Sequence, residues 1–142
     1  MPKITETKYK IKYNQPNKFD IYERAVKQFG VDFEKGVVFT IGNKIYANQS
    51  LPDHLIIHET THIRQQAKMG IEKWWNQYFK CEEFRFLQEV EAYKNQYNFA
   101  KKTCRDRNQV FNLLKKMAKD LSGSMYGNLC SFSKALEVIT TK

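Results

Sequence analysis

The first part of the chain shows the alternation and breaks that are typical of strands and one short helix. Residues 3–13 end in Ile11 and Tyr13, which alternate with lysines as in a strand with one solvated face. Residues 20–29 place apolar side chains at helical spacing, and Gly30 follows as a helix end. The chain therefore begins with a predicted strand and a predicted amphipathic helix.

A β-hairpin is predicted next, before a long helical stretch. Residues 36–41 and 44–47 are rich in β-formers, and the Gly42-Asn43 link between them is a common hairpin turn. From Leu51 onward the apolar spacing is helical, with Ser50 placed three residues before Asp53 as in a capping box. The predicted helices cover residues 51–69, 71–79, 82–103, 108–121 and 133–139.

Strands that come first and helices that come later indicate an α+β fold. We expect a small N-terminal antiparallel sheet or hairpin, followed by a mainly helical part. The chain carries no repeat, low-complexity tract or linker, so residues 1–142 are expected to form a single domain.

One short motif carries recognisable chemistry: residues 58–62 read His-Glu-Thr-Thr-His, an HExxH sequence inside the first long predicted helix. On a helix, His58 and His62 lie one turn apart on the same face and can hold one Zn²⁺ ion at ~2.0–2.1 Å. Glu59 lies about 100° round the helix, beside a water that the metal activates. We therefore expect zinc as cofactor, His58 and His62 as ligands, and Glu59 as general base.

A catalytic zinc site usually has three protein ligands, so a third must come from elsewhere. His54 is a poor choice, because eight residues of helix turn it about 80° away from His62. Glu89 and Glu91, on the helix predicted over residues 82–103, are better placed. Glu89 flanks the apolar stripe of that helix and is favoured, while Glu91 stays open.

Together, His58-Glu59-Thr60-Thr61-His62 and Glu89-Val90-Glu91-Ala92 resemble the gluzincin branch of zinc metallopeptidases. The resemblance covers about residues 50–97 and implies a zincin-like fold around a central HExxH helix, with Glu89 as the third zinc ligand. It also implies hydrolysis of a peptide or protein substrate. Several of these families have Asp at the position of Tyr93, and that Asp forms a hydrogen bond to a zinc-binding histidine. The resemblance therefore does not identify the residue that forms this hydrogen bond here.

A looser resemblance extends to Trp74-Trp75 and to small predicted metallopeptidases encoded by tailed phages and prophages. It implies a viral origin and adds no substrate. It leaves a second function open, in which a phage structural or assembly protein keeps a zinc-bound zincin fold without proteolysis.

A peptidase also needs a hydrogen-bond donor for the oxygen that becomes charged during hydrolysis. Tyr93 is expected in this catalytic role, and Tyr126 is a second candidate. Residues 44–47 are expected to form an edge strand that holds the substrate by β-augmentation. Four more residues are expected to support the motif by packing or bracing: Gln65, Gln66, Trp74 and Trp75.

The composition of the chain limits the kinds of partner and the cellular compartment that we expect. The net charge of +9 suits either a solvated basic surface or an acidic partner, and the chain lacks the signatures of nucleic-acid-binding modules, which argues against nucleic acid. Three widely spaced cysteines are expected to be reduced thiols. No apolar signal or membrane segment is evident, so we expect a cytoplasmic protein, in a host cytoplasm or a virion if phage-encoded.

Overall fold

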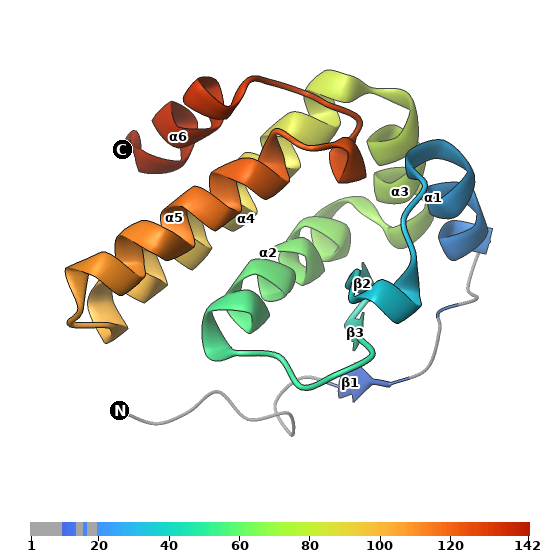
Figure 1. Cartoon of the computed structure of the whole chain (residues 1–142). Coiled ribbons are helices and arrows are strands. Elements are labelled where there is room, and N and C mark those ends of the chain that lie inside the picture. Colours follow the sequence, from blue (N-terminus) through green and yellow to red (C-terminus); the bar gives the residue numbers. More distant parts are fainter. Residues whose placement is uncertain (1–9, 14–15, 17–19) are drawn as a thin grey trace.

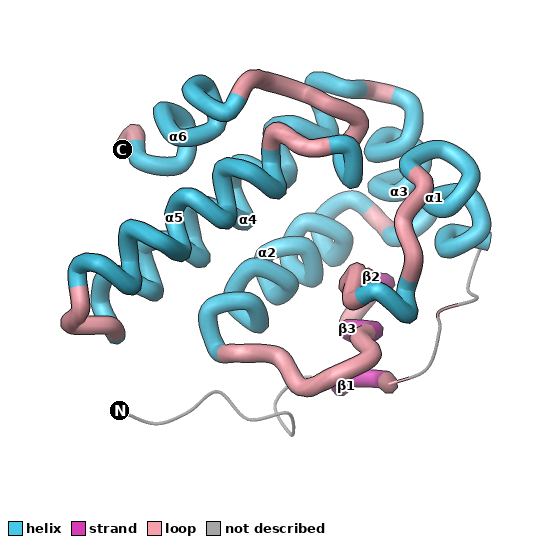
Figure 2. Tube along the Cα trace, viewed as in Figure 1, coloured by secondary structure: helices cyan, strands magenta, loops and turns pink. Residues whose placement is uncertain are grey.

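The fold is given by a computed structural model that describes residues 10–13, 16 and 20–142. A small three-stranded sheet and a larger set of helices make up the structure, which confirms the α+β class (Figures 1 and 2). The elements in chain order are β1 (Lys10–Lys12), α1 (Ile21–Phe29), β2 (Phe39–Ile41), β3 (Lys44–Tyr46), α2 (Asp53–Met69), α3 (Ile71–Lys80), α4 (Glu82–Thr103), α5 (Arg107–Leu121) and α6 (Phe132–Thr140). Two single 3-10 turns cover Phe33–Lys35 and Ser124–Tyr126.

The sheet is mixed rather than purely antiparallel. The predicted hairpin is confirmed, since β2 and β3 pair antiparallel and Gly42 takes a φ of +65° in the link between them. The third strand contradicts the antiparallel expectation, because β1 pairs with β3 in parallel, with Ile11 opposite Ile45. Helix α1 lies between β1 and the hairpin, and a crossover of this kind is what a parallel pair requires. Residues 3–9 of the first predicted strand lie outside the described residues.

The order of the strands in the sheet also corrects the expectation of an edge strand. The order is β1-β3-β2, so β3 is central and the expectation of an edge strand at residues 44–47 is wrong. Both of its sides are already paired with neighbouring strands. The strand that packs against α2 is β2.

The start of α2 also differs from the expectation. The helix begins at Asp53, with Pro52 in the N-cap position and no side-chain capping bond, so the proposed Ser50 capping box is wrong. Pro52 has a φ of −67° and lacks an N–H, which suits the residue at a helix entrance. The predicted end at Gly70 is confirmed.

Helix α2 lies between the sheet and α4, and α5 and α6 both pack against α4 (Figure 1). The faces that α2 and α4 turn inward are unusually polar. The buried polar residues of these two helices are His58, Glu59, Thr60, Thr61, His62, Gln66, Arg85, Glu89 and Gln96. Buried polar groups need partners, and the contacts of His58, Glu59, His62, Glu89 and Gln96 make up the site described below.

The apolar core gathers around α3. Trp74 and Trp75 are 1% and 6% exposed, which confirms the expectation that they pack inside, and Tyr78 and Phe79 are buried with them. Among the described residues, no helix combines the length and apolar character needed to cross a membrane.

Candidate metal centre

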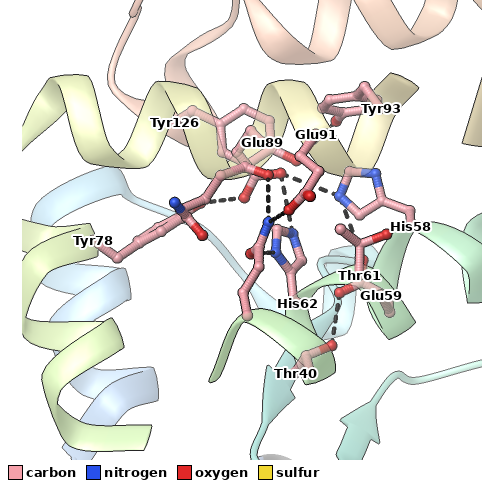
Figure 3. A network of polar contacts seen from close by, with 12 residues as sticks. Thr40, His58, Glu59, Thr61, His62, Tyr78, Glu89, Glu91, Tyr93 and Tyr126 are labelled. Atoms are coloured by element: carbon pink, nitrogen blue, oxygen red, sulfur yellow. Dashed lines mark hydrogen bonds and ion pairs between the residues drawn. The ribbon is translucent and has the colours of Figure 1, made fainter. Parts of the chain in front are cut away.

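Three side chains from two helices converge on one buried point. His58 Nε2 and His62 Nε2 lie 3.1 and 3.3 Å from the same oxygen, Oε1 of Glu89 (Figure 3). All three residues are buried, and their donor atoms lie within 4.8 Å of one another. Tetrahedral zinc with bonds of ~2.0–2.1 Å separates its ligand atoms by about 3.3 Å. The donor set therefore has the chemistry and spacing to hold a metal ion.

The structure separates the two glutamates that the sequence left open. Glu89 faces inward to the histidines, whereas Glu91 is exposed and accepts a hydrogen bond from Gln65 Nε2 at 2.7 Å. His54 lies outside the group, and its Nδ1 contacts Gln96 Nε2 at 2.8 Å. Glu89 is thus the carboxylate that the structure brings to His58 and His62.

Glu59 lies beside the three converging residues without joining them. Its Oε1 accepts a hydrogen bond from the Thr40 hydroxyl at 2.8 Å, and its Oε2 is 3.9 Å from His58 Nε2 (Figure 3). Burial raises the pKa of Glu59, against the opposing effect of the two histidines. A carboxyl group with a raised pKa, fixed through one oxygen, accepts a proton more readily than an ordinary glutamate.

The negative charge of Glu89 is stabilised by the groups around it. Burial disfavours that charge, but His62 and the hydrogen bonds of both histidines hold the pKa of Glu89 well below its usual range. Burial also disfavours a charged His62, yet the carboxylate of Glu89 raises the pKa of His62 to about 9. The second oxygen of Glu89 accepts a hydrogen bond from the Tyr78 hydroxyl at 2.7 Å. In the metal-free protein, Glu89 and His62 therefore form a charged pair.

A glutamine holds the outer nitrogen of His62. Gln65 Nε2 donates to the carbonyl of Gln88 and to Glu91, which are both acceptors, so its Oε1 must face His62 Nδ1 at 2.8 Å. His62 Nδ1 therefore carries a proton in both charge states, and the additional proton of charged His62 is on Nε2, which faces Glu89. The expectation that Gln65 braces the motif is confirmed.

The outer nitrogen of His58 has a similar partner. His58 Nδ1 is 3.0 Å from Gln96 Oε1, while Gln96 Nε2 is 2.8 Å from His54 Nδ1. If His58 Nε2 binds a metal, its Nδ1 is protonated and donates to the Gln96 oxygen. The amide of Gln96 then donates to His54, which acts as the acceptor that keeps Gln96 in this orientation.

Tyr93 and Tyr126 form a hydroxyl pair close to the histidines. Their hydroxyls share a hydrogen bond at 2.8 Å, and the Tyr93 ring lies 4.4 Å from the His58 ring, centroid to centroid. Burial, with the nearby charge of Glu89, raises the pKa of each hydroxyl well above its usual value. Both hydroxyls therefore keep their protons at neutral pH. One of them donates within the pair, which leaves the other available as a donor to a further group.

Two spaces reach the centre and share His58, Glu59 and Tyr126 among their lining residues. The larger is an open cleft of about 500 Å³, which Tyr93 lines as well. A smaller pocket of about 60 Å³ lies beside His62 and Glu89 and is walled mainly by apolar and aromatic side chains. A molecule in the cleft can therefore contact Glu59 and the two tyrosines together.

Sequence reasoning missed three supporting residues: Thr40, Tyr78 and Gln96. Each forms its hydrogen bond with a residue of a different helix or strand, so no local sequence spacing indicates its role. The only available signal was polar residues on helix faces that should be apolar, as with Gln96 on α4.

Comparison with known proteins adds no relative. No family model, curated protein or solved structure gives a significant match to this chain. What the site itself defines is a buried His-His-Glu group, suited to a metal ion, with a further carboxyl group that lines a cleft.

Proposed function

We propose that the protein is a zinc-dependent peptidase of the zincin type, related to the gluzincins. The observation that carries this proposal is the convergence of His58, His62 and Glu89 beside the separately held carboxyl group of Glu59. Two imidazole nitrogens and one carboxylate oxygen suit zinc, with a fourth position left for a reacting molecule. A peptide or protein substrate would enter through the 500 Å³ cleft.

Hydrolysis of a peptide bond needs a proton to be removed from water and delivered to the leaving amine. Zinc bound at this site would polarise the carbonyl and lower the pKa of water toward ~7. Glu59 takes a proton from the water whose oxygen forms the new bond to carbon. When the carbon–nitrogen bond breaks, Glu59 returns this proton to the amine. Thr40 holds one oxygen of Glu59 so that the other faces the site.

Tyr93 and Tyr126 supply the donor that the reaction needs for the carbonyl oxygen as it gains negative charge. Tyr126 lines both spaces that reach the centre, whereas Tyr93 lines only the open cleft. Within the pair, Tyr126 is therefore the better placed to contact substrate, with Tyr93 orienting its hydroxyl. The sequence led us to expect Tyr93 as the donor itself. In this proposal Tyr93 instead supports the donor, Tyr126.

We further propose that the enzyme works in a cytoplasm. Its three cysteines are free thiols, as in proteins of reducing compartments. A phage-encoded enzyme would meet the same conditions in the host cell.

The experiment that tests the proposal compares wild type with Glu59→Gln and Glu91→Gln in zinc content and in cleavage of a diverse peptide library. Wild type and both variants should hold one zinc per chain. Glu59→Gln should lose about 10²–10⁴-fold in hydrolysis, because it removes the general base. Glu91→Gln, an exposed change on the same helix as Glu89, keeps an acceptor oxygen for Gln65 and should keep nearly full activity.

Three results would contradict the proposal. A wild type that takes up no zinc when zinc is offered would remove the metal centre. A zinc-loaded wild type that cleaves nothing, or a Glu59→Gln variant as active as wild type, would remove the peptidase. Zinc without cleavage would favour the phage structural or assembly function.

A further inference from the structure

A cluster of exposed cations lies where α4 ends and α5 begins. We call residues 97–115 the basic tip (lower left in Figure 1). The tip contains five exposed cations, Lys101, Lys102, Arg105, Arg107 and Lys115, and one acid, Asp106. It thus supplies a net +4 of the chain's +9 in 19 residues. No ion pair within the described part of the chain neutralises these five cations.

A groove of about 390 Å³ runs between the two helices at this tip. Tyr97, Val110, Phe111 and Leu114 make its floor mainly apolar. Phe111 is 57% exposed, the largest exposed fraction among the large apolar side chains that the structure describes. An exposed phenylalanine in a groove between cations is a feature that stability of the fold does not require.

Cations border the groove and lie against its aromatic rings. Lys101 and Arg107 line the groove itself. Lys101 Nζ lies 4.7 Å above the Tyr97 ring, and Lys115 Nζ lies 5.0 Å above the Phe111 ring. The surface therefore offers an apolar slot with ammonium and guanidinium groups along its edges.

We propose that the basic tip docks an acidic polypeptide segment that inserts one apolar side chain into the groove. Carboxylates of the segment would pair with Lys101 and Arg107, and the apolar side chain would rest on Phe111 and its aliphatic neighbours. Such pairing of a charged rim with an apolar centre is the usual anatomy of a protein interface. The charge complementarity selects an acidic partner.

The same observations disfavour single-stranded nucleic acid. Binding of that kind relies on bases stacking on open aromatic faces. Here an ammonium group already covers one face of Tyr97 and one of Phe111. The aliphatic part of the floor, Val110 and Leu114, offers no stacking surface.

The docking surface is separate from the metal centre. No residue that lines the groove also lines the cleft or the small pocket. On α5, Phe111 in the groove and Lys116 at the cleft are five residues apart, which is about 140° round the helix. Docking therefore goes beyond the proposed peptidase function and is measured without catalysis.

The test uses fluorescence anisotropy of a short labelled peptide in which glutamates flank a single leucine. The double variant Lys101→Glu/Arg107→Glu should weaken binding of this probe at least about tenfold. Phe111→Ser should weaken it as well, and so should replacing the leucine of the probe by serine. Because Phe111 and both cations are exposed, these variants are expected to fold, which circular dichroism checks.

The matched control is Lys68→Glu/Lys80→Glu, which changes the net charge equally at exposed positions in the last turns of α2 and α3. It should bind the peptide nearly as wild type does. Equal loss in both double variants would reduce the effect to bulk charge and overturn the proposal. Binding that is indifferent to leucine and Phe111, or an oligothymidylate bound more tightly than the peptide at the tip, would overturn it too.

Discussion

Neutral amides, rather than carboxylates, hold the outer nitrogens of both histidines at the candidate centre. Gln65 and Gln96 orient His62 and His58 without adding charge. Two carboxyl groups, Glu59 and Glu89, are already buried there, and one divalent cation can balance the charge of both. Further buried carboxylates would leave uncompensated negative charge, which is strongly unfavourable in an interior.

We predict that Gln96→Leu lowers zinc affinity about 10–100-fold, because His58 loses the acceptor that fixes its ring. Competition with a chromophoric chelator measures this affinity. Gln77→Leu, an exposed change on α3, is the control and should leave it unchanged. His54→Gln, which keeps an acceptor for the Gln96 amide, should bind zinc more tightly than His54→Leu. Equal affinities for wild type and Gln96→Leu would contradict this role.

The sequence made some of these residues predictable and hid others. His58, Glu59 and His62 form one linear motif, whose spacing on a helix is fixed. Glu89 required a judgement about which side of α4 faces inward, and the apolar stripe favoured it only mildly. Gln96 was hidden because its partners, His58 and His54, lie 38 and 42 residues away in the sequence.

Gln66 joins the sheet to the central helix. Its Oε1 accepts from the Gly42 N–H at 2.8 Å, and its Nε2 donates to the Thr40 carbonyl at 2.7 Å. One buried side chain thus satisfies two backbone groups at the hairpin, as the expected bracing role implied. The same link sets Thr40 on β2 beside Glu59 on α2, which is how the small sheet contributes to the centre.

Replacing Gln66 by leucine should lower the free energy of unfolding by about 2–4 kcal/mol, since an N–H and a C=O lose their partners in the interior. Urea unfolding of the metal-free protein measures this loss. Gln77→Leu again serves as the exposed comparison and should stay within about 0.5 kcal/mol of wild type. A similarly small change for Gln66→Leu would mean that the hairpin is anchored by other contacts.

The helices were easier to predict than the sheet. Gly70 and the change of pattern at residues 81 and 104 mark helix ends locally, and α4 spans the residues that were expected. The strands are three residues long, and the pairing of β1 with β3 joins segments more than 30 residues apart. No local pattern encodes such pairing, so the parallel strand and the central place of β3 escaped prediction.

Metal binding should be linked to pH through the whole buried centre. In the metal-free protein Glu89 raises the pKa of His62 to about 9, so His62 carries a proton at neutral pH. A metal ion needs the unprotonated nitrogen and must displace this proton. As far as it depends on His62, the apparent affinity for the metal ion should therefore rise with pH up to about 9 and level off above that pH.

We predict that zinc binding at pH 7.5 releases about one proton from His62. Isothermal titration calorimetry in two buffers with different ionisation enthalpies measures this release, after correction for the proton equilibria of zinc and buffer. Glu89→Gln removes the charge that raises the pKa of His62, so the proton released from this group should fall well below one. Identical heats in the two buffers for wild type would show that His62 is already neutral.

Helix α5 borders both the cleft and the basic tip, through Lys116 and Asp120 on one side and Phe111 and Leu114 on the other. The path over the surface of α5 from the groove to the cleft follows part of the circumference of a helix about 10–12 Å across. Roughly six extended residues can span it. A polypeptide tethered at the tip would hold its neighbouring residues at ~mM effective concentration near the cleft. Avidity from the tether, rather than tight recognition at the scissile bond, would then decide which chains are cut.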